Sequence, residues 1–130
     1  MAYKVSHHSP FKKNISNIQV QNQNIILNVC DKIQASPNIG EAMKGSFKKL
    51  GFKYYRIRDT NPEYRIIYKV YHCKTINKKN IHLCNLEMHH NNKEELINCN
   101  GLVDFIVTGT REFFNNFYGK SEKEIKIYLK

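Results

Sequence analysis

Residues 52–71 read FKYYRIRDTNPEYRIIYKVY, and this stretch decides the fold. On either side of the turn residues Asp59–Pro62, side chains alternate with a period of two. That period predicts strands at 52–58 and 64–71. Two strands joined by a short run of turn residues predict an antiparallel hairpin.

The same alternation assigns each hairpin side chain to one of two faces. The face expected in the core carries Tyr55, Ile57, Ile66, Tyr68 and Val70. Arg56 and Arg58 lie two residues apart, so we expect both to be accessible on the opposite face. Taken alone, such a pair is typical either of an ordinary solvated strand face or of a phosphate-binding surface.

The residues before the hairpin predict a strand followed by two helices. Residues 3–8 alternate weakly, as an opening strand does. Ser9-Pro10 is typical of a helix start, with Ser9 as the N-cap and Pro10 at the first helical position. Apolar residues then recur with the helical period over 11–18 and again over 18–33. Ser36-Pro37 should end the second helix, because the residue before a proline disfavours helix.

The residues after the hairpin predict more strand and then helix. Residues 81–88 and 102–108 are strand candidates, separated by a polar loop with a helical turn near 94–97. Thr110 suits the start of a helix over Arg111–Tyr118, and Gly119 suits its end. Ser121–Glu124 has the capping-box pattern for a last helix.

This order of elements predicts an α+β fold. An N-terminal strand and a helical hairpin should pack on a small, mainly antiparallel twisted sheet that is followed by a C-terminal helix. The chain has 130 residues and neither an internal repeat nor a linker-like stretch, so we expect a single domain over 1–130.

Charge favours a polyanionic partner. Lys and Arg number 21 against 11 Asp and Glu, which gives a formal net charge of +10. Surplus positive charge attracts nucleic acids, although a composition rich in Lys, Asn and Ile is also typical of AT-rich genomes. There is no run of about twenty apolar residues, and Met1–His8 lacks the features of a secretory signal. We therefore expect a cytoplasmic protein without membrane contact.

The cysteines do not form a recognisable metal motif. Cys30, Cys73, Cys84 and Cys99 include no CxxC pair. Zinc could use His82, Cys84, His89, His90 and Cys99. Structural zinc sites usually show closer paired spacing, so we expect buried free thiols, no metal and no small-molecule cofactor.

Three segments resemble the RelE/ParE toxin family. They are SPNIGEAMKG (36–45), the hairpin strands YYRIRD (54–59) and YRIIYKV (64–70), and VTGTREFF (107–114). The last is similar to the closing strand and turn of YafQ-like members. The chain departs from the pattern between the hairpin and the closing strand, where relatives have about ten residues and this chain has the insertion 72–101. The insertion leaves open which strand neighbours the hairpin, and it could add a strand at the sheet edge.

The resemblance implies RNA cleavage in which the ribose 2′-hydroxyl attacks the adjacent phosphate. The protein must then hold the backbone in line, stabilise the charge on the phosphorane and move two protons. By position, Arg111 and Arg65 are the implied catalytic arginines, and Tyr118 is the implied base or stacking group. The residues implied in RNA binding are Arg56, Arg58, Lys53 and Lys44.

Several of these roles have structural alternatives. Arg65 could pair with Asp59 or Glu63 to hold the hairpin. Phe114 or Phe117 could occupy the place of Tyr118. Tyr54, Tyr64 and Tyr68 are more often strand packing than base-stacking platforms.

Other acid–base groups have weaker support in the sequence. His89-His90 could serve acid catalysis or be exposed histidines at a strand end. Asp104 and Glu112 show no paired carboxylate at useful spacing, which argues against carboxylate acid–base chemistry.

At the level of the whole protein, the resemblance implies the toxin of a type II toxin–antitoxin system. It would be an endoribonuclease that cuts mRNA on the ribosome and is neutralised by a cognate antitoxin protein. The alternatives are a ParE-like toxin that inhibits DNA gyrase without cleaving nucleic acid, and an inactive basic binding module.

Overall fold

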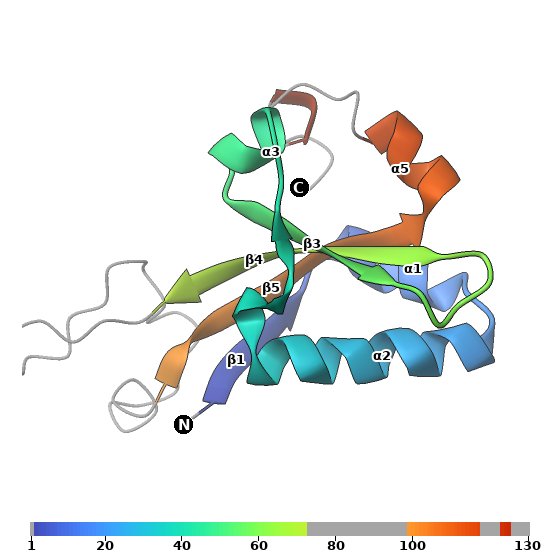
Figure 1. Cartoon of the computed structure of the whole chain (residues 1–130), viewed down its shortest axis with the longest axis horizontal. Helices are drawn as coiled ribbons and strands as arrows, with labels where there is room; N and C mark the ends of the chain where they lie inside the picture. The colour runs from blue at the N-terminus through green and yellow to red at the C-terminus, as the bar shows by residue number, and fades with distance from the viewer. Residues whose placement is uncertain (1, 73–98, 118–122, 126–130) are drawn as a thin grey trace, which may run out of the picture.

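A computed structural model describes residues 2–72, 99–117 and 123–125. The strands are β1 (Ala2–His7), β2 (Glu41–Ala42), β3 (Phe52–Ile57), β4 (Tyr64–His72) and β5 (Cys99–Thr110). The helices are α1 (Ser9–Ser16), α2 (Val20–Ala35), the short α3 (Ser46–Lys49) and α5 (Arg111–Phe117), with a 3-10 turn η1 at Pro37–Ile39. The strands form one sheet in the order β1-β5-β4-β3-β2 (Figure 1).

The sheet is antiparallel except where β1 pairs in parallel with β5. The predicted hairpin is confirmed as β3 and β4, and the predicted α+β class is confirmed with it. β5 lies directly beside β4, with Tyr64 opposite Thr110 and His72 opposite Gly101. The closing strand therefore neighbours the hairpin. The strand expected at 81–88 and the helical turn expected at 94–97 fall outside the described residues.

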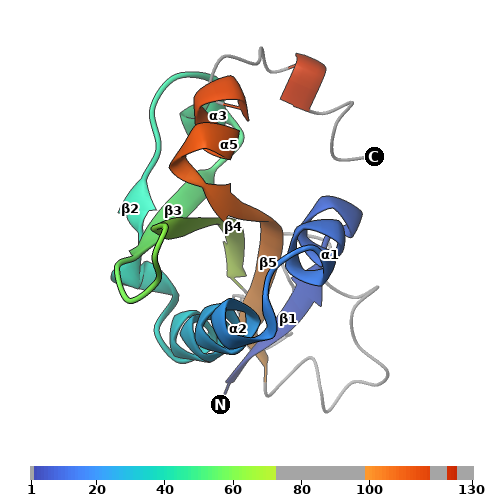
Figure 2. The same cartoon turned by 90° about the vertical axis from the view of Figure 1, so that its right-hand side faces the viewer.

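One face of the sheet packs against α1 and α2 (Figure 2). Its buried side chains are Phe11, Ile26, Val29, Cys30, Ile33, Ile57, Ile66, Tyr68, Val103 and Phe105. Ile57, Ile66 and Tyr68 are in the core as predicted, whereas Tyr55 and Val70 are half-buried at its margin. Burial raises the pKa of the Cys30 thiol to about 12, which makes it a packing residue rather than a nucleophile.

The opposite face is also covered, by α3 and α5 (Figures 1 and 2). Its buried side chains are Met43, Phe47, Phe52, Ile67, Ile106, Val107, Phe114, Phe117 and Ile125. The sequence predicts the helical hairpin on one face and a C-terminal helix with no face assigned, and it predicts neither α3 nor β2. Phe114 and Phe117 are core residues, so neither occupies a catalytic position. The part of this face that lies toward the β3–β4 turn carries Arg56 and Arg65.

Two predicted helix boundaries need correction. His8, not Ser9, is the N-cap of α1, and Pro10 is the second helical residue. The cause is the sheet: the His8 N–H donates to the Phe105 carbonyl (2.9 Å), which keeps the chain extended for one residue more. α2 begins at Val20, so Ile18 belongs to the connection before it. No helix in the described ranges is long and apolar enough to cross a membrane.

Candidate functional site

Arg56 and Arg65 lie directly opposite each other on β3 and β4. Cross-strand partners share a face, and this face carries Ile67 and the other α3–α5 core residues. The Arg56 side chain is 41% exposed and that of Arg65 is 17% exposed. Two like charges in this arrangement repel each other, so the pair needs a compensating anion.

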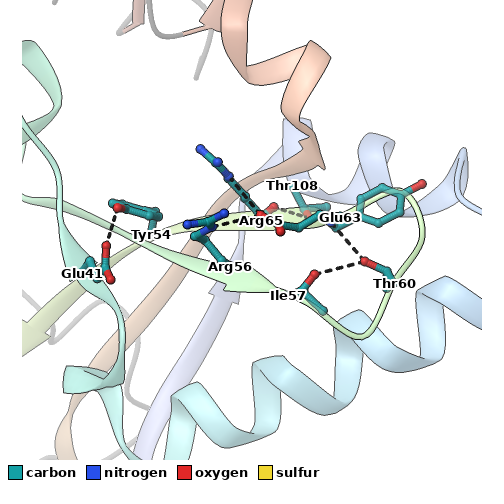
Figure 3. A network of polar contacts seen from close by, with 9 residues as sticks. Glu41, Tyr54, Arg56, Ile57, Thr60, Glu63, Arg65 and Thr108 are labelled. Carbon is teal, nitrogen blue, oxygen red and sulfur yellow. Dashed lines mark hydrogen bonds and ion pairs between the residues drawn. The ribbon is translucent and has the colours of Figure 1, made fainter.

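Glu63 supplies that anion (Figure 3). Its Oε1 accepts a hydrogen bond from Arg56 Nε at 3.0 Å and lies 3.7 Å from Arg65 Nε. The hydrogen bond from Arg56 lowers the pKa of Glu63, with help from the charges of Arg56, Arg65 and Arg58. The same contact raises the pKa of Arg56. Glu63 thus stays ionised and holds the arginine pair together.

A cleft of about 490 Å³ opens beside this pair. Its lining residues come from β3, the turn, β4 and the start of α5: Arg56, Asn61, Pro62, Glu63, Arg65, Thr110, Arg111 and Glu112. The arginines at 56, 65 and 111 are far apart in the sequence, and the fold brings them to one place. We call this the arginine cleft.

Arg111 reaches the arginine cleft because α5 starts immediately after β5. Gly109 lies opposite Arg65 on the neighbouring strand. A Cβ at Gly109 would lie 2.7 Å from the ring of Phe113, so only glycine lets the first turn of α5 pack this closely on β5. The Thr-Gly-Thr segment 108–110 therefore has a structural role in positioning Arg111, whose side chain is exposed.

The strand that carries Arg65 and the turn before it are held by buried and partly buried hydrogen bonds. Thr108 Oγ1 donates to the Arg65 carbonyl at 2.8 Å (Figure 3), and the Thr108 N–H donates to Asn14 Oδ1 at 3.0 Å. Thr60 Oγ1 accepts from the Tyr64 N–H and donates to the Ile57 carbonyl, which closes the turn. Arg56 and Arg65 thus stand on hydrogen-bonded strands rather than on a loop.

The remaining predicted site residues are spread around the arginine cleft. Arg58 is exposed just past the end of β3 and, with Arg56, lines an adjoining depression of about 260 Å³. Lys53 lies opposite Tyr68, which places it on the α1–α2 face, away from the arginines. Lys44 is exposed and borders a second depression that includes Arg65. Tyr118 lies outside the described residues.

The carboxylates of this site were not predicted from the sequence. Glu63 was considered there only as a structural partner of Arg65, and Glu112 was set aside for want of a second carboxylate. The fold places both in the lining of the arginine cleft. The two-residue spacing from Glu63, just before β4, to Arg65 is the signal present in the sequence; no sequence spacing relates Glu63 to Glu112.

A separate polar cluster joins β1 to β5. Asp104, which is buried, accepts hydrogen bonds from Ser6 Oγ (2.6 Å), with His8 Nε2 at 2.7 Å from its other oxygen. Ser6 contacts Asp104 rather than His8, so this is not a nucleophile–base arrangement. Among the described residues, no three His, Cys, Asp or Glu side chains are grouped as metal ligands. His82, Cys84, His89 and His90 lie outside those residues.

Comparison with solved structures identifies the fold. The free-state structure of an E. coli toxin RelE variant with two arginines changed to alanine matches with a TM-score of 0.57, covering 100% of both chains at 14% identity. No protein-family model matches the sequence, and neither does any curated protein. The chain has a RelE-like fold, and the resemblance seen in its sequence is confirmed at that level. At this identity the activity has to be argued from the arginine cleft.

Proposed function

We propose that this chain is the toxin of a toxin–antitoxin pair and acts in the cytoplasm as an endoribonuclease on ribosome-bound mRNA. One observation carries the proposal: the arginines at 56, 65 and 111, from β3, β4 and α5, line one cleft. Guanidinium groups bind phosphate oxygens in bidentate fashion and keep their charge at any physiological pH. A cleft with several of them suits a phosphodiester whose charge increases during reaction.

In this mechanism the nucleophile belongs to the substrate. The ribose 2′-hydroxyl attacks the adjacent phosphorus, the bond to the 5′-oxygen breaks, and the products carry a 2′,3′-cyclic phosphate and a 5′-hydroxyl. Arg56 and Arg65 hold the phosphate in line, and Arg111 stabilises the phosphorane. Arg58 and Lys44 extend the basic surface along the RNA backbone on either side.

One proton must leave the 2′-hydroxyl and another must reach the 5′-oxygen. Glu63 is a poor base for the first step because its contact with Arg56 lowers its pKa. Its carboxylate instead occupies the region where a phosphate oxygen would lie, so RNA binding should displace it from Arg56. Tyr118 is the proposed proton-transfer residue, on the strength of the family resemblance, since a cluster of arginines can stabilise a phenolate.

The decisive experiment maps RNA ends. Purified protein should cut ribosome-bound mRNA and leave 5′-hydroxyl ends, and the Arg111→Ala variant should cut far more slowly. A parallel DNA gyrase supercoiling assay tests the ParE-like alternative. Gyrase inhibition without RNA cleavage would overturn the nuclease proposal, and absence of both activities would leave a basic binding module.

A further inference from the structure

Tyr54 stands next to the arginine cleft on the same face of the sheet. It precedes Arg56 by two residues on β3, so the two side chains share a face and their Cα atoms are about 6.6 Å apart. Tyr68, in contrast, is buried in the α1–α2 core, and Tyr64 packs against that core. Among these tyrosines, Tyr54 has the position from which its ring can meet a ligand bound at Arg56 and Arg65.

A depression of about 330 Å³ lies beside Tyr54. It is lined by Ala42, Met43, Lys44, Phe47, Tyr54 and Arg65. Met43 and Phe47 form a buried apolar floor, and Lys44 stands exposed at the rim. Because Arg65 also lines the arginine cleft, the two cavities adjoin at this residue.

The Tyr54 ring is held in place without a ligand. Its hydroxyl donates a hydrogen bond to the Glu41 carboxylate, and Glu41 is its direct partner across the β2–β3 pairing (Figure 3). The ring also packs against the α3–α5 core. An aromatic surface that is fixed beforehand loses little conformational freedom when a planar group stacks on it.

We propose that this depression binds a nucleobase adjacent to the phosphate in the arginine cleft, with Tyr54 as its stacking platform. The inference rests on the proposed function and adds a base subsite to it. Tyr54 and Arg56 are two residues apart on β3. A ribose spans a comparable distance between its base and its phosphate. The apolar floor accepts the flat base, while Lys44 and Arg65 meet the flanking phosphates. Stacking tolerates any base, so the subsite should orient the RNA more than it selects sequence.

The test pairs a protein change with an RNA change. Binding is measured for a 2′-O-methyl trinucleotide, which cannot be cleaved, and for versions that lack one base at a time or all three. For the wild type, loss of one particular base should weaken binding about fivefold to a hundredfold, the range for a stacked base. Tyr54→Leu should weaken binding of the intact RNA similarly and remove that dependence, while Tyr54→Phe should keep it.

The outcomes separate this inference from the proposed function. Equal binding of intact and base-free RNA by the wild type overturns the base subsite and leaves the arginine cleft standing. Failure to bind either RNA overturns the subsite, while the proposed function is decided separately by RNA-end mapping on ribosomes. Unequal binding that Tyr54→Leu does not alter assigns the base to another surface. If Tyr54→Leu does not fold, Tyr54→Ile replaces it, and the wild-type RNA series alone can still refute the subsite.

Discussion

Glu63 determines how the arginine cleft behaves before any ligand arrives. Its carboxylate contacts Arg56 at 3.0 Å and approaches Arg65 to 3.7 Å. Because the folded state lowers the pKa of Glu63 from the ordinary 4.5, this contact stabilises the fold above about pH 4.5. The stabilisation is lost as the pH falls through the lower pKa of the folded state. At neutral pH, RNA therefore meets an arginine pair that is already partly neutralised.

Replacing Glu63 should consequently strengthen RNA binding. We expect Glu63→Gln to raise affinity for a short uncleavable RNA by about threefold to tenfold, because one negative charge no longer competes for Arg56. Fluorescence anisotropy at fixed salt measures the change. Glu112→Gln is the matched control, since it removes the same charge from the wall of the arginine cleft. Equal gains from both variants would show that general charge, rather than the Arg56 contact, limits binding.

Arg111 separates chemistry from binding. If it stabilises the phosphorane, its contribution is larger in the transition state than in bound RNA. Arg111→Ala should then lower the single-turnover cleavage rate roughly a hundredfold to a thousandfold. Arg111→Lys should rescue little, because a point charge lacks the guanidinium fork. Arg56→Ala is the comparison and should mainly weaken binding. Unchanged cleavage by Arg111→Ala at saturating ribosome would remove Arg111 from the mechanism.

Residue positions on the hairpin could be predicted because a strand has a strict period. The alternation over 52–71 assigned Arg56 to the accessible face, as found. Arg58 is exposed as well, although it lies just past the end of β3 at Ile57. The same alternation places Lys53 and Arg56 on opposite faces of the sheet, because one position is odd and the other even. The family resemblance, which implied RNA binding for both residues, does not take this alternation into account. Convergence of Arg111 with the hairpin depends on the pairing of β4 with β5, which no local pattern encodes.

At the scale of elements, the contact between β5 and α5 positions Arg111. A methyl group at Gly109 would collide with the Phe113 ring, and α5 would have to shift. We expect Gly109→Ala to lower cleavage by up to about a hundredfold, the scale for a displacement near 1 Å. RNA affinity should change less, because Arg56 and Arg65 stand on other strands. Adding Phe113→Leu should restore part of the rate. A rate unaffected by Gly109→Ala would show that α5 tolerates the shift.

A second contact between elements holds the segment that leads into β2. The buried Tyr68 hydroxyl donates to the Pro37 carbonyl (2.7 Å) and accepts from the Gly40 N–H (2.9 Å). Burial raises the pKa of Tyr68 to about 12, so the hydroxyl keeps its proton. Tyr68→Phe leaves both backbone groups without this partner and should lower the free energy of unfolding by about 1–3 kcal/mol in urea denaturation. The hydrogen bond from the Tyr54 hydroxyl to Glu41 is exposed. Tyr54→Phe should therefore lower the free energy of unfolding by less. Equal losses would contradict this account.

The elements that the sequence did not predict are the short ones. β2 has 2 residues and α3 has 4, too few for a period to be recognised. The segment 36–45, which carries part of the resemblance, contains Gly40 and Gly45, and the structure gives a physical reason for each. A Cβ at Gly40 would lie 2.2 Å from the Tyr68 hydroxyl, and Gly45 has a φ of 65°. Longer elements, such as α2 and β4, carry enough repeats to be predicted within two or three residues.

For the whole molecule, the open question is what the net charge of +10 does. A basic composition that merely reflects the genome would attract RNA diffusely, from lysines anywhere on the surface. A specific binding site would instead limit the RNA contacts to a few phosphates and the arginines that face them. The two cases differ in how binding responds to salt, because each phosphate contact releases condensed counterions.

The salt response should therefore distinguish the arginine cleft from the overall charge. We expect the double variant Arg56→Gln, Arg111→Gln to reduce the slope of log affinity against log salt by about 1.4, since each contact with a single strand contributes about 0.7. The matched control is Lys12→Gln, Lys13→Gln: it removes the same charge, from exposed positions on α1, which packs on the opposite face of the sheet. Its slope should stay close to that of the wild type. If both double variants reduce the slope by the same amount, the overall charge of the protein attracts the RNA. The arginine cleft is then not the place where RNA binds.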